Sequence, residues 1–195
     1  MKRHINTIQR FERNFSFKSA RQDDVVSVLA LESPDTHYLN AARGWLGLGN
    51  WMEAFSELER IRPNMRAHPD VLEIKYRICA MSGQWTEAML ICQTLTSLAP
   101  DRVFGWLNLS VALNKLERTR EAYNMLLPVL ERFPQDPLIR YALARYACRE
   151  GLYKEASAWL RRSFDIGDPF QLMTAALNDP SLQPLWLNLG VAAEM

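Results

Sequence analysis

The residues that could perform chemistry are few and scattered along this chain. Its 195 residues include three histidines and three cysteines, the types most used as bases, nucleophiles and metal ligands. His4, His37 and His68 lie far apart in sequence, and no Cys-x-x-Cys, His-Glu-x-x-His or glycine-rich phosphate loop occurs. We therefore expect no enzyme activity, no bound metal and no cofactor.

The cysteines are predicted to be structural. Cys79 and Cys92 lie on apolar helix faces, where a small buried thiol is a commoner finding than a metal or redox pair. Cys148 is expected to be partly exposed, and the carboxylates Glu57 and Glu59 to be solvated. Three thiols cannot form a disulfide framework, and no signal peptide or membrane span is evident. A reducing, cytoplasmic location is the expectation.

A 34-residue repeat organises the sequence. The dipeptide Glu-Ala recurs at that spacing, as Glu53-Ala54, Glu87-Ala88, Glu121-Ala122 and Glu155-Ala156. A glycine and an aromatic residue precede three of the four copies, whereas the third copy has Glu117-Arg118-Thr119 there. Prolines follow the same spacing. Four copies in register indicate a repeat architecture.

Each repeat is predicted to be a pair of helices. In the third repeat, Trp106 and Leu113 mark one apolar helix face, and a second apolar stripe follows a short turn. The alanine of each Glu-Ala pair is placed where the second helix crosses the first closely. Pro128 lies inside the predicted second helix and should kink it near Leu126. Aspartates beside the repeat prolines, such as Asp136, are predicted to lie at helix N-caps or in first turns.

These features resemble the tetratricopeptide repeat (TPR), and in particular bacterial TPR proteins of unassigned role. The resemblance rests on the period, on Trp-Leu-Asn-Leu-Ser at 106–110 and on the Gly-x-Trp/Tyr-x-Glu-Ala turns. It implies an all-α fold, a right-handed α-solenoid of about four helix-turn-helix repeats with a concave groove. The predicted parts are an N-terminal arm (1–33), repeats at 35–68, 69–102, 103–136 and 137–170, and C-terminal capping helices (171–195).

The resemblance also implies where a partner would bind. TPR-like folds hold extended or helical peptides on the inner face of each first helix. The position eleven residues before the paired alanine is expected there, as is the position four residues earlier. These positions hold Arg43, Arg77, Val111 and Arg145, and Leu39, Glu73, Leu107 and Tyr141, and Arg149 lies one turn beyond Arg145.

The leading hypothesis is a non-catalytic scaffold that binds a peptide or protein segment in this groove. Arginine can hold a carboxylate with both arms of its planar guanidinium, so we expect a ligand with an acidic group and an apolar anchor. The alternative is that these arginines are ordinary surface charges, since Glu73 and Arg77 have the spacing of an intrahelical pair. The Lys/Asn set of chaperone-tail-binding TPR proteins is not matched.

The N-terminal arm has a different pattern, in which apolar residues recur at helical spacing among basic ones. The residues concerned are Lys2, Arg3, Ile5, Ile8, Arg10, Phe11, Arg13 and Phe15. Such a pattern is typical of attachment to an anionic membrane surface or partner, with the repeats as an adaptor. The arm, helical or disordered, could also cap the first repeat or be an extension without a role.

The distribution of charge supports this division. Residues 1–21 contain six basic residues and one acidic residue, whereas the rest of the chain contains 17 basic and 21 acidic residues. The formal net charge of +1 disfavours nucleic acid as a partner. A protein or peptide partner is expected, membrane contact would involve residues 1–21, and homo-oligomers remain open.

Overall fold

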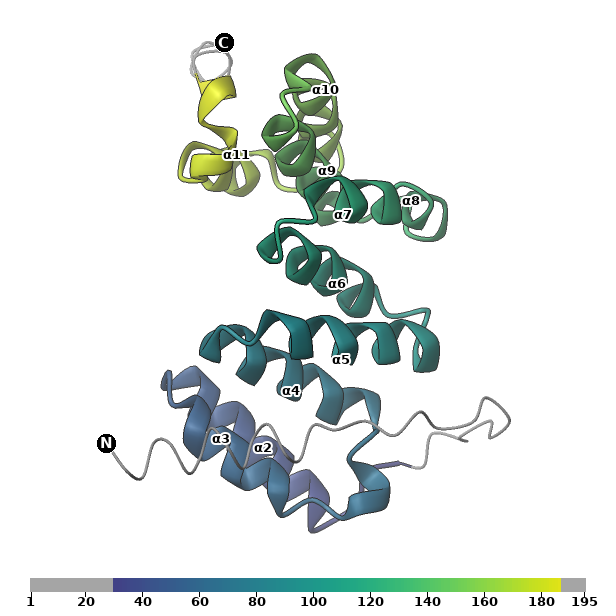
Figure 1. The fold of residues 1–195 in the computed structure, drawn as a ribbon, viewed down its shortest axis with the longest axis vertical. Helices are drawn as coiled ribbons and strands as arrows, with labels where there is room; N and C mark the ends of the chain where they lie inside the picture. The colour runs from purple at the N-terminus through teal and green to yellow at the C-terminus, as the bar shows by residue number, and fades with distance from the viewer. Residues whose placement is uncertain (1–29, 187–195) are drawn as a thin grey trace. The chain divides into compact units, whose positions relative to one another are not determined.

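The computed structural model describes residues 30–186, which form helices without a strand (Figure 1). In chain order the elements are α2 (Asp35–Gly47), α3 (Trp51–Glu59), η1 (Pro63–Met65), α4 (Pro69–Ser82), α5 (Trp85–Leu98), α6 (Val103–Lys115), α7 (Thr119–Leu126), α8 (Val129–Arg132), α9 (Pro137–Arg149), α10 (Tyr153–Phe164), α11 (Pro169–Leu177) and η2 (Pro180–Leu185). The predicted all-α fold of successive helix pairs is confirmed.

The chain divides into two compact units, and the boundary falls inside α5, after Ile91. In the first unit α2 packs against α3, and α4 packs against both. The turn from α2 to α3 places Gly49 at a φ of 76°, a left-handed conformation that favours glycine. The side chain of Asn50 then caps α3 by accepting a hydrogen bond from the backbone N–H of Glu53 at 3.3 Å.

An ion pair between a buried carboxylate and a half-exposed arginine closes the first unit. Asp35, at the start of α2, is fully buried, and its carboxylate accepts hydrogen bonds from the side chain of Arg62 at 2.7 Å and from the backbone N–H of Arg62 at 3.0 Å. Burial by itself would raise the pKa of Asp35, but the hydrogen bonds and charge of Arg62 outweigh it and lower the pKa below its usual value. The pair joins α2 to the turn that follows α3.

The second unit continues with α6 to η2. Here α6 packs on α7, α9 packs on α6, α7 and α10, and α11 packs on α10. The predicted N-cap at Asp136 is confirmed, because its carboxylate accepts hydrogen bonds from the backbone N–H groups of Leu138 and Ile139. At Pro128, where a kink was predicted, the helix is broken in two: α7 ends at Leu126 and α8 begins at Val129.

The alanines of the Glu-Ala pairs occupy the same place in every repeat. Ala54, Ala88, Ala122 and Ala156 are each 0% exposed. A larger side chain at a fully buried position of a well-packed core is generally destabilising. Their burial agrees with the predicted close crossing of the two helices in each repeat.

The turns between paired helices differ in one repeat. Gly49, Gly83 and Gly151 all adopt a φ of 76°, whereas the third repeat places Glu117 there with a φ of 59°. A side chain in the left-handed region costs about 1–2 kcal/mol. Glu117 is therefore a strained position, and its carboxylate forms an exposed ion pair with Arg149 at 2.9 Å.

Replacing Asp35 by asparagine is expected to lower the free energy of unfolding by about 1–3 kcal/mol, because the substitution removes buried, charge-assisted hydrogen bonds. Guanidinium titration monitored by circular dichroism would measure this change. Since folding lowers the pKa of Asp35, the stabilisation should be present above the ordinary aspartate pKa of 3.8 and should vanish as the pH falls through the lower folded value.

Glu57→Gln, which breaks the exposed pair with Arg60, is the control and should cost less than about 1 kcal/mol. Equal effects would contradict this account.

Replacing Glu117 by glycine is expected to raise the free energy of unfolding by up to about 1 kcal/mol. The relieved backbone strain exceeds the value of an exposed ion pair, which is at most about 1 kcal/mol. The matched substitution Gly83→Ala should have the opposite sign, because it introduces a side chain at a φ of 76°. Urea titrations of both variants would measure the two changes, and a loss of stability in Glu117→Gly would show that the strain is overestimated.

Candidate functional site

Two of the predicted arginines meet in the first unit. Arg43 of α2 and Arg77 of α4 are exposed and line one open pocket of about 380 Å³. The other residues around this pocket are Leu46, Gly47, Tyr76, Ala80 and Met81. Its walls are therefore largely apolar, with two guanidinium groups among them. We call this site the α2/α4 pocket.

The guanidinium of Arg43 is accessible in the α2/α4 pocket. It donates a hydrogen bond to the side-chain oxygen of Asn40, one turn earlier on α2, at 3.2 Å. Because the acceptor is a neutral amide oxygen, this hydrogen bond does not balance the positive charge of Arg43. Met81 is 45% exposed at the rim and offers apolar surface beside the charge.

The two other predicted residues of the first unit lie elsewhere. Leu39 is only 3% exposed and belongs to the core of the first unit, so it offers a partner almost no surface. Glu73 is half-buried and does not line the α2/α4 pocket. Sequence spacing alone did not distinguish Leu39, which is buried on α2, from Arg43, which is exposed on the same helix.

In the second unit, the predicted residues of α6 and α9 are more enclosed. Leu107 and Val111 of α6 are half-buried. Arg149 of α9 donates hydrogen bonds to the side-chain oxygen of Asn114 at 3.0 Å and to the carboxylate of Glu117 at 2.9 Å. Arg149 is thus already engaged within the unit, between α9 and the end of α6.

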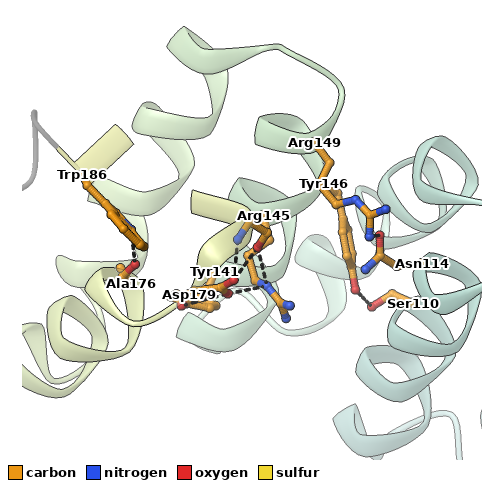
Figure 2. A network of polar contacts seen from close by, with 10 residues as sticks. Ser110, Asn114, Tyr141, Arg145, Tyr146, Arg149, Ala176, Asp179 and Trp186 are labelled. Atoms are coloured by element: carbon orange, nitrogen blue, oxygen red, sulfur yellow. Dashed lines mark hydrogen bonds and ion pairs between the residues drawn. The ribbon is translucent and has the colours of Figure 1, made fainter. Parts of the chain in front are cut away.

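Tyr141 and Arg145 of α9 meet a carboxylate of the chain itself, as Figure 2 shows. Arg145 forms an ion pair with Asp179 at 2.6 Å, and the hydroxyl of Tyr141 donates to the same carboxylate at 3.4 Å. Burial and the neighbouring charge of Asp179 raise the pKa of Tyr141 to about 12, so this hydroxyl remains a hydrogen-bond donor at neutral pH.

A buried hydrogen bond between α6 and α9 was not predicted. The hydroxyls of Ser110 and Tyr146 lie 2.9 Å apart, and both residues are 0% exposed (Figure 2). Because Ser110 donates its single hydroxyl hydrogen to the carbonyl of Leu107 at 2.6 Å, the hydroxyl of Tyr146 is the donor in this pair. The only signal in the sequence was a serine on the apolar face of the first helix.

The cysteines are poorly placed for thiol chemistry. Burial and the nearby charge of Glu87 raise the pKa of Cys79 to about 12, which suppresses the reactive thiolate. Cys148 is 4% exposed, so the expectation of partial exposure was wrong: it lies on the packed side of α9, and burial raises its pKa as well. Within residues 30–186, no group of three or more histidine, cysteine and acidic side chains is arranged to hold a metal ion.

Part of the predicted site lies outside the described residues. The arm positions Lys2, Arg3, Ile5, Ile8, Arg10, Phe11, Arg13 and Phe15 all precede residue 30. The attachment hypothesis therefore stays a prediction from sequence. Between Ala30 and Trp186, the helices are too short or too polar to cross a bilayer.

Comparison with known proteins places the fold. No protein-family model matches the sequence, and none of the curated proteins is similar to it. Among solved structures, a thermophilic TPR protein of Thermus thermophilus, TTC0263, is similar with a TM-score of 0.66 and 18% identity, over 80% of this chain and 83% of that one. MamA from Desulfovibrio magneticus RS-1 (residues 41 to the end) gives a TM-score of 0.64 and 17% identity, over 85% and 96% of the two chains. The chain therefore has the fold of the tetratricopeptide-repeat proteins.

Proposed function

We propose that this protein is a non-catalytic scaffold that binds a segment of another protein at the α2/α4 pocket. The observation that carries the proposal is the convergence of Arg43 and Arg77, from consecutive repeats, on one open pocket with apolar walls. The repeat position that places them there is the one expected to face a partner. Proteins of this fold commonly act through such surfaces, and the fold supports an interaction role in general.

The chemistry of the pocket selects its ligand. The guanidinium of Arg43 can present a planar pair of N–H donors to a carboxylate, and the exposed side chain of Arg77 adds a second positive charge to the same pocket. Leu46, Tyr76 and Met81 offer apolar contacts beside them. A segment that carries an aspartate or glutamate next to a leucine, methionine or aromatic side chain satisfies both parts of this surface. A base or a polyphosphate would leave the apolar walls without a partner.

A cytoplasmic location and the absence of catalysis are parts of this proposal, and whether the chain also assembles with a second copy stays open. Attachment of the arm to a membrane or anionic partner concerns residues before residue 30, outside the described residues, and stays a prediction from sequence.

Reversing both charges of the pocket, in the variant Arg43→Glu with Arg77→Glu, is expected to weaken ligand binding strongly. The probe is a phage-displayed library of random peptides selected on the full-length chain, followed by titration of the enriched peptides in solution. We expect enrichment of acidic residues beside apolar ones. Affinity for these peptides should fall about a hundredfold in the double variant, because two charge-assisted contacts are lost.

A matched control separates the pocket from general electrostatics. The variant Arg120→Glu with Arg161→Glu makes the same change in net charge at two exposed positions on α7 and α10, outside the α2/α4 pocket. It should bind the peptides as the wild type does, and both variants should keep the helical circular dichroism spectrum. Equal losses in the two variants, or peptides without acidic residues, would contradict the proposal.

A further inference from the structure

The C-terminal segment, which we define as Asp179–Leu185, packs against α9 on the side that carries Tyr141 and Arg145. Its carboxylate, Asp179, pairs with Arg145 at 2.6 Å, and the side chain of Arg145 also donates to the hydroxyl of Ser181 at 3.3 Å. Tyr141 donates to Asp179 from one turn earlier on α9. Figure 2 shows these side chains converging on Asp179.

Arg145 occupies the same position in its repeat as Arg43 and Arg77 do in theirs. Arg145 lies eleven residues before Ala156, just as Arg43 lies eleven before Ala54 and Arg77 eleven before Ala88. In the first unit the corresponding arginines line an open pocket. In the second unit the corresponding arginine holds a carboxylate. The chain therefore displays, at one repeat, the kind of contact that the proposed function requires at another.

The C-terminal segment also has an apolar anchor. The carboxylate of Asp179 accepts a hydrogen bond from the backbone N–H of Ser181 at 3.0 Å, which begins the 3-10 helix η2. Leu182 and Leu185 are 0% and 2% exposed, and η2 packs against α9, α10 and α11. An aspartate followed three residues later by a buried leucine thus fits this face.

We propose that the Tyr141–Arg145 face of α9 is a second binding site for acidic protein segments, occupied in this structure by the chain's own C-terminal segment. Its ligand class is an aspartate with a leucine three residues later, and a partner that carries this pattern competes with residues 179–185. This inference rests on the proposed scaffold function, but it concerns a different site, so the two can fail separately.

The properties of the contact permit such competition. The side chains of Arg145 and Asp179 are 32% and 14% exposed, so water reaches the ion pair and weakens it relative to a fully buried one. The segment is tethered to α11 by a short turn, which gives it an effective concentration in the millimolar range. A partner segment that makes additional contacts can bind tightly enough to compete with the tethered segment at this effective concentration.

The test uses the full-length chain and a fluorescein-labelled synthetic peptide with the sequence of residues 178–185, Asn-Asp-Pro-Ser-Leu-Gln-Pro-Leu. In the variant Asp179→Asn, the asparagine can still cap η2, but the charge that pairs with Arg145 is gone. Fluorescence anisotropy should show that Asp179→Asn binds the peptide about tenfold or more tightly than the wild type, because its own segment competes less well. A peptide with asparagine in place of its aspartate should bind neither protein.

Three further variants identify the site. Adding Arg145→Gln to Asp179→Asn should remove the gain in affinity, whereas adding Arg77→Glu should leave it unchanged. Gln183→Ala, an exposed position of the C-terminal segment, should behave as the wild type. If Arg77→Glu removes the gain and Arg145→Gln does not, the peptide binds at the α2/α4 pocket. The present inference is then overturned while the proposed function stands.

A measurement on the wild type keeps the inference falsifiable if Asp179→Asn unfolds. The indole N–H of Trp186 donates to the carbonyl of Ala176 at 3.0 Å, at the end of the C-terminal segment (Figure 2). Its ¹H–¹⁵N resonance, assigned with Trp186→Phe, should shift as millimolar peptide displaces the segment. No increase in peptide affinity in a folded Asp179→Asn chain, or an unmoved Trp186 resonance, would overturn the inference.

Discussion

The close crossing of the two helices in each repeat is the constraint on which the rest of the structure depends. Ala54, Ala88, Ala122 and Ala156 are completely buried, so each lies within the packing between helices. Fixing the crossing fixes which side of the first helix faces its partner and which side remains open. Position along the 34-residue period then determines the role of each side chain, including the arginines eleven residues before each of three alanines.

The repeat position eleven residues before the paired alanine is therefore found in three different environments. Arg43 and Arg77 line an open pocket, Val111 is half-buried, and Arg145 is paired with Asp179. The difference lies in what the neighbouring segments supply and not in the helix that carries the residue. An exposed guanidinium beside apolar walls is suited to a partner, whereas the same group beside Asp179 contacts the C-terminal segment.

The sequence predicted what the repeat period controls, and little else. Helix pairs, the interruption at Pro128 and the cap at Asp136 follow from local rules that act within a few residues. The partner of Arg145 could not be predicted, because Asp179 belongs to an irregular segment beyond the last repeat and meets α9 only after packing. The burial of Leu39 and the bond between Ser110 and Tyr146 likewise depend on how neighbouring helices meet. The sequence period predicts on which face of a helix a residue lies, whereas the packing of neighbouring helices determines how deeply that residue is buried.

The central claim is that arginines at one repeat position recognise carboxylates. The most direct measurement follows the side-chain ¹H–¹⁵N resonances of arginine in the full-length chain, assigned by single substitutions, while an acidic peptide enriched on the wild type is added. The account predicts that the Nε–H signals of Arg43 and Arg77 shift together and saturably. Those of Arg60 and Arg118, which pair with Glu57 and Glu121 and do not line the α2/α4 pocket, should stay in place. Uniform small shifts of all arginines, or saturable shifts confined to Arg60 and Arg118, would contradict it.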